Sequence, residues 1–341
     1  MNDWRKVSAL KRLGHRVAVS ALTLVGVLML VFVIARVLPG DPARLQAGPY
    51  ATDAELESIR AEMGLNDALP TQLLQFLGDV VRLDLGTSTR TSRPVVEELF
   101  DRIPATLELS LGALAAATLL GVLLGIAAAF REGAVVDHLV RSAIVVGTSM
   151  PVFWVGMILL FIFFSTLGWA PPPLGRLPVL ANPPTSITGL YTLDSALTLN
   201  WKAFWQAIAS LWLPVSALAL VVFAPIANVT RTALIRELGS DYIRTQRSLG
   251  LPVGRDALRT ALPPIITTIG VVLGYLIGGN VLIESLFAWP GIGQYAWQAL
   301  ANRDIPALQG VVLLVGAFYI AMNVLIEITY VASDPRVRSQ A

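Results

Sequence analysis

Six stretches of this sequence contain no charged residue, and their length constrains the fold more than any other feature. Each stretch has at least 19 residues. An α-helix rises about 1.5 Å per residue, so about 20 residues cross the ~30 Å hydrocarbon core of a bilayer. The buried helices of a water-soluble domain would be shorter and would carry a charged face. The pattern therefore predicts six membrane-spanning helices, in the runs 17–35, 109–130, 142–170, 203–230, 261–283 and 305–326.

Composition supports the same class of protein. Charged residues make up 14% of the chain and the mean hydropathy is +0.67, whereas a soluble domain has about 25% charged residues. A cleaved signal peptide is the alternative for the first run, but its apolar region would span only about 7–15 residues. We therefore expect residues 17–35 to form a retained helix. The chain contains no cysteine, which excludes disulfides, thiol nucleophiles and cysteine metal sites.

The Lys and Arg residues predict the orientation of the chain in the membrane. Short cytoplasmic loops are enriched in these residues. Five of them precede the first run, two lie in 131–141, six in 231–262 and two after residue 331. Both termini are therefore expected in the cytoplasm.

Residues 38–103 form the one long segment expected outside the membrane. Thr52 with the acidic residues that follow it is typical of a helix N-terminus, and Gly64 of a C-terminus. A second amphipathic stretch runs from about residue 70 to residue 83. We expect these two short helices to form an outer cap. The chain then divides into a tail with the first helix, the outer segment, a five-helix core and a second tail, at 1–37, 38–103, 104–331 and 332–341.

The loop at 231–262 has the pattern of a helix, a break and a second helix. Gly250 can adopt the left-handed conformation that ends a helix, and Pro252 suits the first turn of the next one. Pro263 and Pro264 would then fix this helical hairpin to the start of the fifth span. On the residues alone, a basic loop that follows the orientation rule explains the pattern equally well.

The spacing from Gly250 to Leu262-Pro263 resembles the signature of ABC-importer permeases, the EAA motif. The segment 241–245 is similar to the Asp-Tyr-Val-Arg-Thr form of the dipeptide/oligopeptide/nickel family. In that family the loop contains a coupling helix that docks on an ATPase subunit. The resemblance implies this role for the following residues: Asp241, Tyr242, Arg244, Thr245, Arg247, Gly250, Leu251, Leu262 and Pro263.

The sequence also departs from the family pattern within this loop. Gln246 and Ser248 stand where the family usually has alanine, and Leu249 stands where it usually has lysine. Thr260 replaces the isoleucine of the general motif, and Asn228 replaces the first arginine of an upstream Arg-x-Thr-Arg pattern. These departures indicate a divergent member, matched to an ATPase surface of its own.

Further segments resemble the same family, in order, along nearly the whole chain. They lie at 38–42, 64–65, 83–88, 151–154, 189–195 and 284–293. The last contains an outer-loop signature formed by Pro290, Gly291 and Gly293.

The resemblance implies an all-α type I importer permease fold in the bacterial inner membrane, without catalytic activity or a cofactor of its own. Partners implied by it are a second homologous permease subunit and two ATPase subunits or domains that use ATP and Mg. An extracytoplasmic binding protein would deliver a peptide or similar small solute to the outer loops 38–103 and 168–206. Relatives carry dipeptides, longer peptides, glutathione, nickel complexes or sugars, so the substrate stays open. Nothing points to nucleic acid.

A few carboxylates and glycines within the runs allow two interpretations. Glu108, Glu284 and Glu327 lie near the ends of spans, where structural anchoring competes with function; Glu284 is the one favoured for a role at the outer gate. Glycines 270, 274 and 278 recur every four residues and allow close helix approach. They serve either packing within this subunit or packing against a partner permease along the pathway.

Two other classes of protein are considered. An ion-coupled secondary transporter would need a charged group near the middle of the membrane and usually inverted repeats, and neither is present in the sequence. An intramembrane enzyme would need a motif such as His-Glu-x-x-His, which is absent, as is the Gly-x-x-x-x-Gly-Lys-Ser/Thr phosphate loop.

Overall fold

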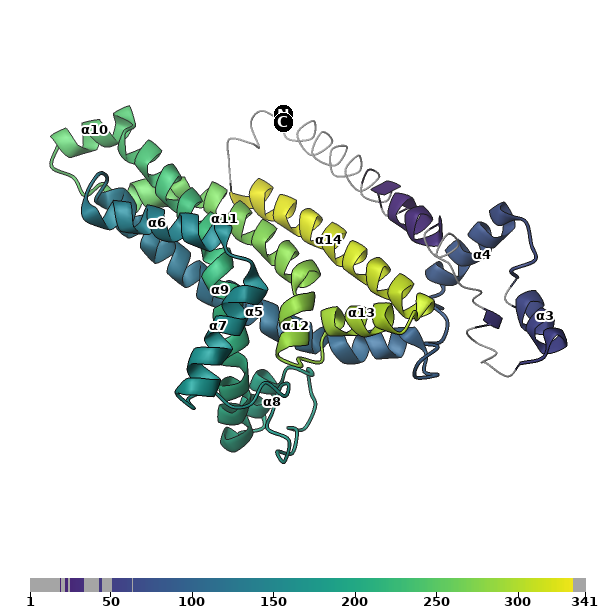
Figure 1. Cartoon of the computed structure of the whole chain (residues 1–341). Helices are drawn as coiled ribbons and strands as arrows, with labels where there is room; N and C mark the ends of the chain where they lie inside the picture. The colour runs from purple at the N-terminus through teal and green to yellow at the C-terminus, as the bar shows by residue number, and fades with distance from the viewer. Residues whose placement is uncertain are drawn as a thin grey trace. The chain divides into compact units, whose positions relative to one another are not determined.

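The computed structural model describes Val19 and residues 22–23, 25–33, 43–44, 51–62 and 64–333. Most of these residues lie in helices (Figure 1). Their only β-type pairing is an isolated bridge between Thr87 and Pro94. The chain divides into two compact units, which are described in turn. One comprises Met1–Ile103 with Gln294–Ile320, and the other Pro104–Gly293 with Ala321–Ala341.

Four helices in the described part of the chain are long and apolar enough to cross a membrane. They are α5 (Val95–Phe130), α9 (Trp201–Leu238), α11 (Gly254–Gly279) and α14 (Ile305–Ser333). A fifth candidate is a bent pair of helices. The predicted first span at 17–35 lies largely outside the described residues. The helical membrane fold is confirmed, and the count of six spans stays a prediction.

The uncharged run at 142–170 is not one straight helix, which corrects the sequence-based expectation. It contains the end of α6 (Val135–Ser149), then α7 (Val152–Leu159) and a π-helix η1 (Leu160–Thr166). The two halves meet at an angle of 104°. Pro151 has no N–H to donate and disfavours helical geometry in the residue before it. Met150 is accordingly extended, with φ −86° and ψ 129°.

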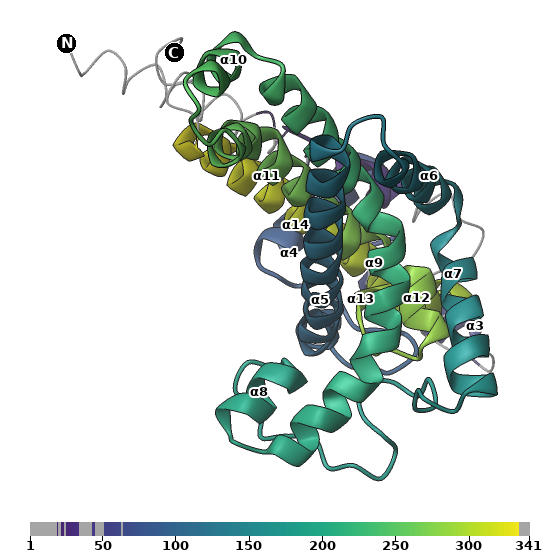
Figure 2. The ribbon, with the colours of Figure 1, turned by 90° about the vertical axis from the view of Figure 1, so that its left-hand side faces the viewer.

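Glycines let α9 pack closely on its neighbours in the larger unit. A Cβ atom on Gly125 of α5 would lie 2.6 Å from Cβ of Thr230 in α9, and one on Gly121 would overlap Ile226. Gly147 of α6 is similarly close to Phe223 of α9. The backbone of each glycine therefore lies directly against a side chain of α9, which leaves no space for a larger residue at these points. Figure 2 shows α10 at one end of the long α9 and α8 at the other.

The smaller unit contains the two short helices predicted for the outer segment. They are α3 (Asp53–Glu62) and α4 (Leu69–Val81). Thr52 and Glu55 exchange the hydrogen bonds of a capping box. Gly64 has φ +62°, as a helix C-terminus requires. The two predicted helices are therefore confirmed.

Buried polar contacts hold the remainder of the smaller unit together. Ser88 donates to Asp304 at 2.5 Å, and the Tyr295 hydroxyl donates to Glu98 at 2.7 Å. Burial and the neighbouring Glu98 carboxylate raise the pKa of Tyr295 well above its ordinary value. Tyr295 lies in α13 (Ile292–Ala301). These contacts connect segments about 200 residues apart in sequence.

Candidate functional site

The hairpin predicted at 231–262 is present, and a single buried apolar side chain anchors its first arm. Its first arm is α10 (Asp241–Ser248), which follows α9 directly, and its second arm is the start of α11. Ile243 is the buried residue of α10. It packs in a cluster drawn from the ends of α5 and α9 and the start of α11: Ala129, Ala233, Leu234, Ala257, Ala261 and Ile265. One face of α10 is thus fixed while the other faces solvent.

Gly250 ends α10 in the conformation that the sequence predicts. Its φ is +73°, and no atom lies within 4 Å of where a Cβ would be. The N–H of Gly250 donates to Arg247 O, and that of Leu251 to Gln246 O. These two bonds form a Schellman motif, which favours glycine at the position that Gly250 holds. The restriction on residue 250 is therefore conformational and not steric.

Two side-chain contacts connect the arms of the hairpin. Gln246 Nε2 donates to Asp256 at 3.0 Å. The Tyr242 hydroxyl lies 3.2 Å from both Glu237 Oε2 and Thr260 Oγ1. Gln246 and Thr260 are two of the departures from the family pattern, and each supplies one side of a contact. These departures therefore bridge the hairpin.

The second arm of the hairpin is continuous with a membrane span, which corrects two expectations. Pro252 lies in the link and not in the first turn, because α11 begins at Gly254. Pro263 and Pro264 lie well inside α11 instead of joining a separate helix to it. Leu262 is exposed and Pro263 is partly buried. The tip of the hairpin is thus attached to the membrane segment without an intervening loop.

A partly buried ion pair near the hairpin end of α9 is not predictable from the sequence. Arg231 contacts Asp137 of α6 in a two-pronged arrangement, with Nε–Oδ1 at 2.5 Å and Nη2–Oδ2 at 2.8 Å. Asp137 also accepts from the N–H of Gly133. The pair connects residues 94 positions apart, a distance at which spacing along the chain carries no signal.

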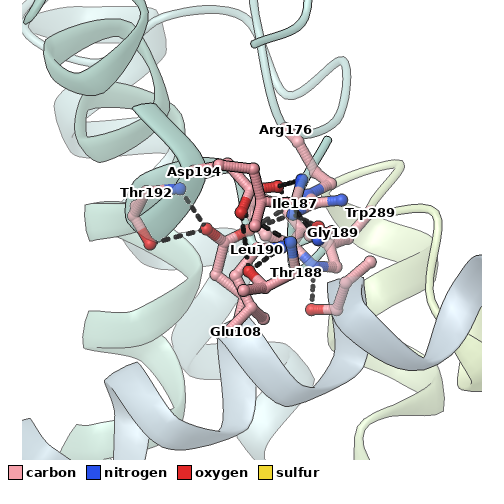
Figure 3. Close-up of polar contacts among 10 residues, drawn as sticks. Glu108, Arg176, Ile187, Thr188, Gly189, Leu190, Thr192, Asp194 and Trp289 are labelled. Carbon is pink, nitrogen blue, oxygen red and sulfur yellow. Dashed lines mark hydrogen bonds and ion pairs between the residues drawn. The ribbon is translucent and has the colours of Figure 1, made fainter. Parts of the chain in front are cut away.

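A second buried ion pair lies at the opposite end of the same unit (Figure 3). Glu108 of α5 is 6% exposed and Arg176 is 8% exposed, and their closest atoms are 2.6 Å apart. The other oxygen of Glu108 accepts from both the N–H and the hydroxyl of Thr192, each at 2.7 Å. Arg176 also donates to Gly189 O and lies over the ring of Tyr191. Glu108 is therefore buried and not exposed to solvent, and it holds the loop 176–192 in place through its contacts with Arg176 and Thr192.

Asp194 stabilises the next turn of the same loop. This buried carboxylate lies in α8 (Tyr191–Leu197) and accepts from the backbone N–H groups of residues 187–189 and from the Thr188 hydroxyl. Burial raises its pKa, but these hydrogen bonds outweigh the burial and hold the pKa of Asp194 below its ordinary value. Gly189 has φ +80°, and a Cβ there would overlap Pro104. The loop thus packs closely on α5, and its charged side chains are buried.

Glu284 and the outer-loop signature form a third buried group on α5. Glu284 lies in α12 (Val281–Leu286), is 0% exposed and accepts from the Thr106 hydroxyl at 2.7 Å. Thr106 in turn accepts from the N–H of Ile292. Glu284 is therefore buried and held by its neighbours at the end of its span. Its role at an outer gate stays a proposal.

The glycines of the signature make room for this carboxylate. A Cβ on Gly291 would overlap Glu284 and Thr106, and a Cβ on Gly293 would meet the backbone of Val281 at 2.7 Å. Pro290, which precedes both glycines, is exposed. The indole N–H of Trp289 donates to Ala105 O at 2.7 Å. The signature thus forms a turn that packs tightly on the carboxylate of Glu284. The motif alone does not indicate this packing.

The comparisons with known proteins agree along nearly the whole chain. Residues 121–339 match the family described as "Binding-protein-dependent transport system inner membrane component", and residues 9–110 match its N-terminal component. The chain belongs to this family. It is a multi-pass membrane permease subunit of an ABC importer and not a catalytic subunit, and the secondary-transporter alternative is not favoured.

Curated relatives cover nearly the same length as this permease. A probable D,D-dipeptide transport system permease protein of Escherichia coli (strain K12) is 42% identical over 93% of this chain and 94% of its own. A di/tripeptide transport system permease protein of Pseudomonas aeruginosa (strain UCBPP-PA14) is 37% identical over 96% and 98%. A dipeptide transport system permease protein of Alkalihalophilus pseudofirmus is 35% identical over 92% and 95%.

The remaining predicted residues of the permease do not come together in one site. Gly270 and Gly274 are partly buried in α11, and Gly278 is exposed. The side chain of Glu327 is not among those that the structure describes. No group of His, Asp or Glu that could hold a metal ion occurs within the part of the chain that the structure describes. The candidate site is therefore the hairpin, and the buried groups on α5 support the far end of the same unit.

Proposed function

We propose that this permease lines half of a pathway for small peptides and that its hairpin transmits the movement of ATPase subunits. The observation that carries this proposal is the hairpin itself, a solvent-facing α10 joined by a rigid Gly250 turn to a helix that continues into the membrane. The coupling residues are those that the family resemblance implies: Asp241, Tyr242, Arg244, Thr245, Arg247, Gly250, Leu251, Leu262 and Pro263.

The partners follow from the family. Two ATPase subunits or domains bind and hydrolyse ATP with Mg, and a second homologous permease completes the pathway. An extracytoplasmic binding protein docks on the outer loops 38–103 and 168–206. Both termini are cytoplasmic. The division into a first tail and helix, an outer segment, a five-helix core and a second tail (1–37, 38–103, 104–331 and 332–341) belongs to the same proposal.

The substrate class rests on the relatives. Those compared above are named for dipeptides, D,D-dipeptides or di- and tripeptides, and we infer a peptide of similar size for this permease. Gly270, Gly274 and Gly278 would let α11 approach the partner permease beside the pathway. Glu284, Pro290, Gly291 and Gly293 would shape the outer gate.

The transmission of movement has a physical basis in the packing of the larger unit. ATP-driven closure of the ATPases would push α10, whose Ile243 is buried among α5, α9 and α11. The Arg231–Asp137 pair joins α9 to α6 close by. A displaced hairpin would therefore move these helices together, because interfaces this tightly packed shift as rigid bodies.

Substitution of Gly250 tests the coupling. Gly250→Val places a β-branched residue at φ +73°, where open space removes any clash and leaves only backbone strain. We expect uptake to fall at least tenfold while the complex still assembles and hydrolyses ATP. Gly250→Asn is the matched control, since asparagine tolerates the left-handed region.

The measurement is vanadate-sensitive ATPase activity and peptide uptake in vesicles that contain the co-purified complex. Equal uptake by the Val and Asn variants would contradict the coupling role of this turn. Absence of any ATPase subunit from the purified complex would contradict the proposed function as a whole.

A further inference from the structure

The tip of the hairpin exposes apolar side chains on both sides of Gly250. Leu249 is 69% exposed and Leu251 is 51% exposed. Leu249 stands at a position where the family usually has lysine. Two adjacent exposed leucines around a rigid turn form a small apolar surface, which we call the leucine tip (Leu249 and Leu251).

The leucine tip lies too far from the hydrocarbon for lipid to cover it. The uncharged run of α11 begins at residue 261, and its 23 residues already exceed the ~20 needed to cross the membrane. Gly254, the first residue of α11, lies seven residues earlier, which is about 10 Å along the helix axis. The leucine tip precedes Gly254 in the chain. A protein surface is therefore better suited than lipid to cover it.

Four arginines lie within eight residues of the leucine tip in sequence, and three of them have no ion pair with any described residue. These are Arg247, Arg255 and Arg259, all exposed. Arg244 has only an exposed contact with Asp241 at 3.6 Å. Asp256, the acidic residue at the start of the second arm, accepts from Gln246. Positive charge at the hairpin is thus presented outwards and not neutralised within it.

The hairpin holds this surface in one arrangement. Ile243 is buried, the Schellman motif fixes Gly250, and Gln246 is bonded across to Asp256. Order that exists before binding lowers the entropy lost on association. A rigid surface of two leucines and flanking arginines is therefore suited to a preformed groove.

We propose that the ATPase groove receiving this hairpin has an apolar floor for the leucine tip and carboxylates along its rim. The inference rests on the proposed function and adds the chemistry of the partner. A carboxylate accepts two parallel N–H bonds from a guanidinium, so Asp or Glu side chains on the rim fit Arg247 and Arg255. The leucines supply affinity, and the arginines supply register and salt sensitivity.

Rebinding of the ATPase tests the inference. The ATPase subunits that co-purify with the permease pair are stripped, and their Kd for the pair in nanodiscs is measured at increasing salt. The double variant Arg247→Glu with Arg255→Glu is expected to raise Kd at least tenfold and to reverse the salt dependence, because salt screens the repulsion between the new carboxylates and those of the rim. Leu249→Ser with Leu251→Ser is expected to raise Kd without changing the salt dependence.

Arg236→Gln is the matched control, because Arg236 is an exposed arginine of α9 that contacts the adjacent Glu237. We expect its Kd to be unchanged. Arg247→Lys should retain most of the salt dependence but lose affinity, because lysine cannot form the two-pronged contact. Size-exclusion elution with the second permease shows that each variant is folded.

Three outcomes overturn the proposal or its basis. An unchanged Kd for the charge-reversal variant overturns the carboxylate rim. A loss of affinity seen in anionic nanodiscs and absent in neutral ones assigns the arginines to the membrane surface, and it also overturns the rim. If the parent pair does not rebind the ATPase at all, the proposed function fails with it.

Discussion

The two ends of the larger unit treat charge in opposite ways. At the end that contains the loop 176–192, Glu108, Arg176 and Asp194 are all buried and satisfied by one another or by backbone groups. At the hairpin, the arginines of the two arms (Arg244, Arg247, Arg255 and Arg259) are exposed and only Ile243 of α10 is buried. α5 and α9 reach from one end to the other. The same pair of helices thus carries a closed polar network and an open charged surface.

The buried charges hold a loop in position, whereas the exposed charges are available for contact with a partner. A buried ion pair contributes little net stability compared with an apolar pair, but it is costly to break and fixes geometry. An exposed arginine contributes little to folding and remains free for a partner. We therefore expect substitutions at the outer network to affect folding first and those at the hairpin to affect transport first.

The largest expected effect is at Glu108. Glu108→Ala leaves Arg176 buried without its carboxylate and removes the acceptor for Thr192. Breaking a buried pair in this way costs about 3–5 kcal/mol, so the thermal midpoint of the purified complex should fall by several degrees. Glu108→Ala combined with Arg176→Met is the control and should recover part of the loss. A midpoint within one degree of the parent for the single variant would show that the loop is held by other contacts.

A smaller effect is expected at Asp194, and it depends on pH. Its pKa in the folded protein lies below the ordinary value of 3.8, so the charged form is stabilised by folding. The contribution is complete above that value and is lost as the pH falls through the folded pKa. Asp194→Asn should lower stability by about 2 kcal/mol at pH 7.

The difference between parent and Asp194→Asn should shrink below about pH 4. Thermal midpoints measured from pH 7 to pH 3 provide the check. A difference that stays constant over this range would mean that the charge of Asp194 is not what the loop binds.

The smallest expected effect on folding is at the hairpin. Gln246→Ala removes the bond to Asp256, and a partly exposed hydrogen bond contributes about 0.5–1.5 kcal/mol at most. We expect no measurable change in thermal midpoint but a two- to threefold loss of uptake per ATP hydrolysed. A large change in the thermal midpoint with normal uptake would show that this residue serves folding and not transport, contrary to the distinction drawn between the two ends.

The sequence was most informative where the signal is local. Runs of about 20 uncharged residues predicted the spans, and the glycine at position 250 predicted the turn with its positive φ. The break at Pro151 was missed because the run continues without charge on both sides of it. A proline within an apolar run allows either a kink or a separation into two helices, and neighbouring helices decide which occurs.

Contacts between distant residues were not predictable. Glu108 and Arg176 are 68 residues apart, and Asp137 and Arg231 are 94 apart. Helical periodicity extends over a few turns only, so it cannot pair charges on different helices. Glu284 was singled out as functional, but its burial against Thr106 and Gly291 followed only from the packing of α12 on α5.

The distance in sequence between Glu108 and Arg176 also orders events during biosynthesis. The ribosome completes Glu108 before it has made the partner that Glu108 needs. Until the loop that contains Arg176 and Thr192 reaches the same side of the membrane, this carboxylate must remain hydrated. The end of α5 that carries Glu108 therefore acquires its ion pair only after the chain beyond α7 has been made.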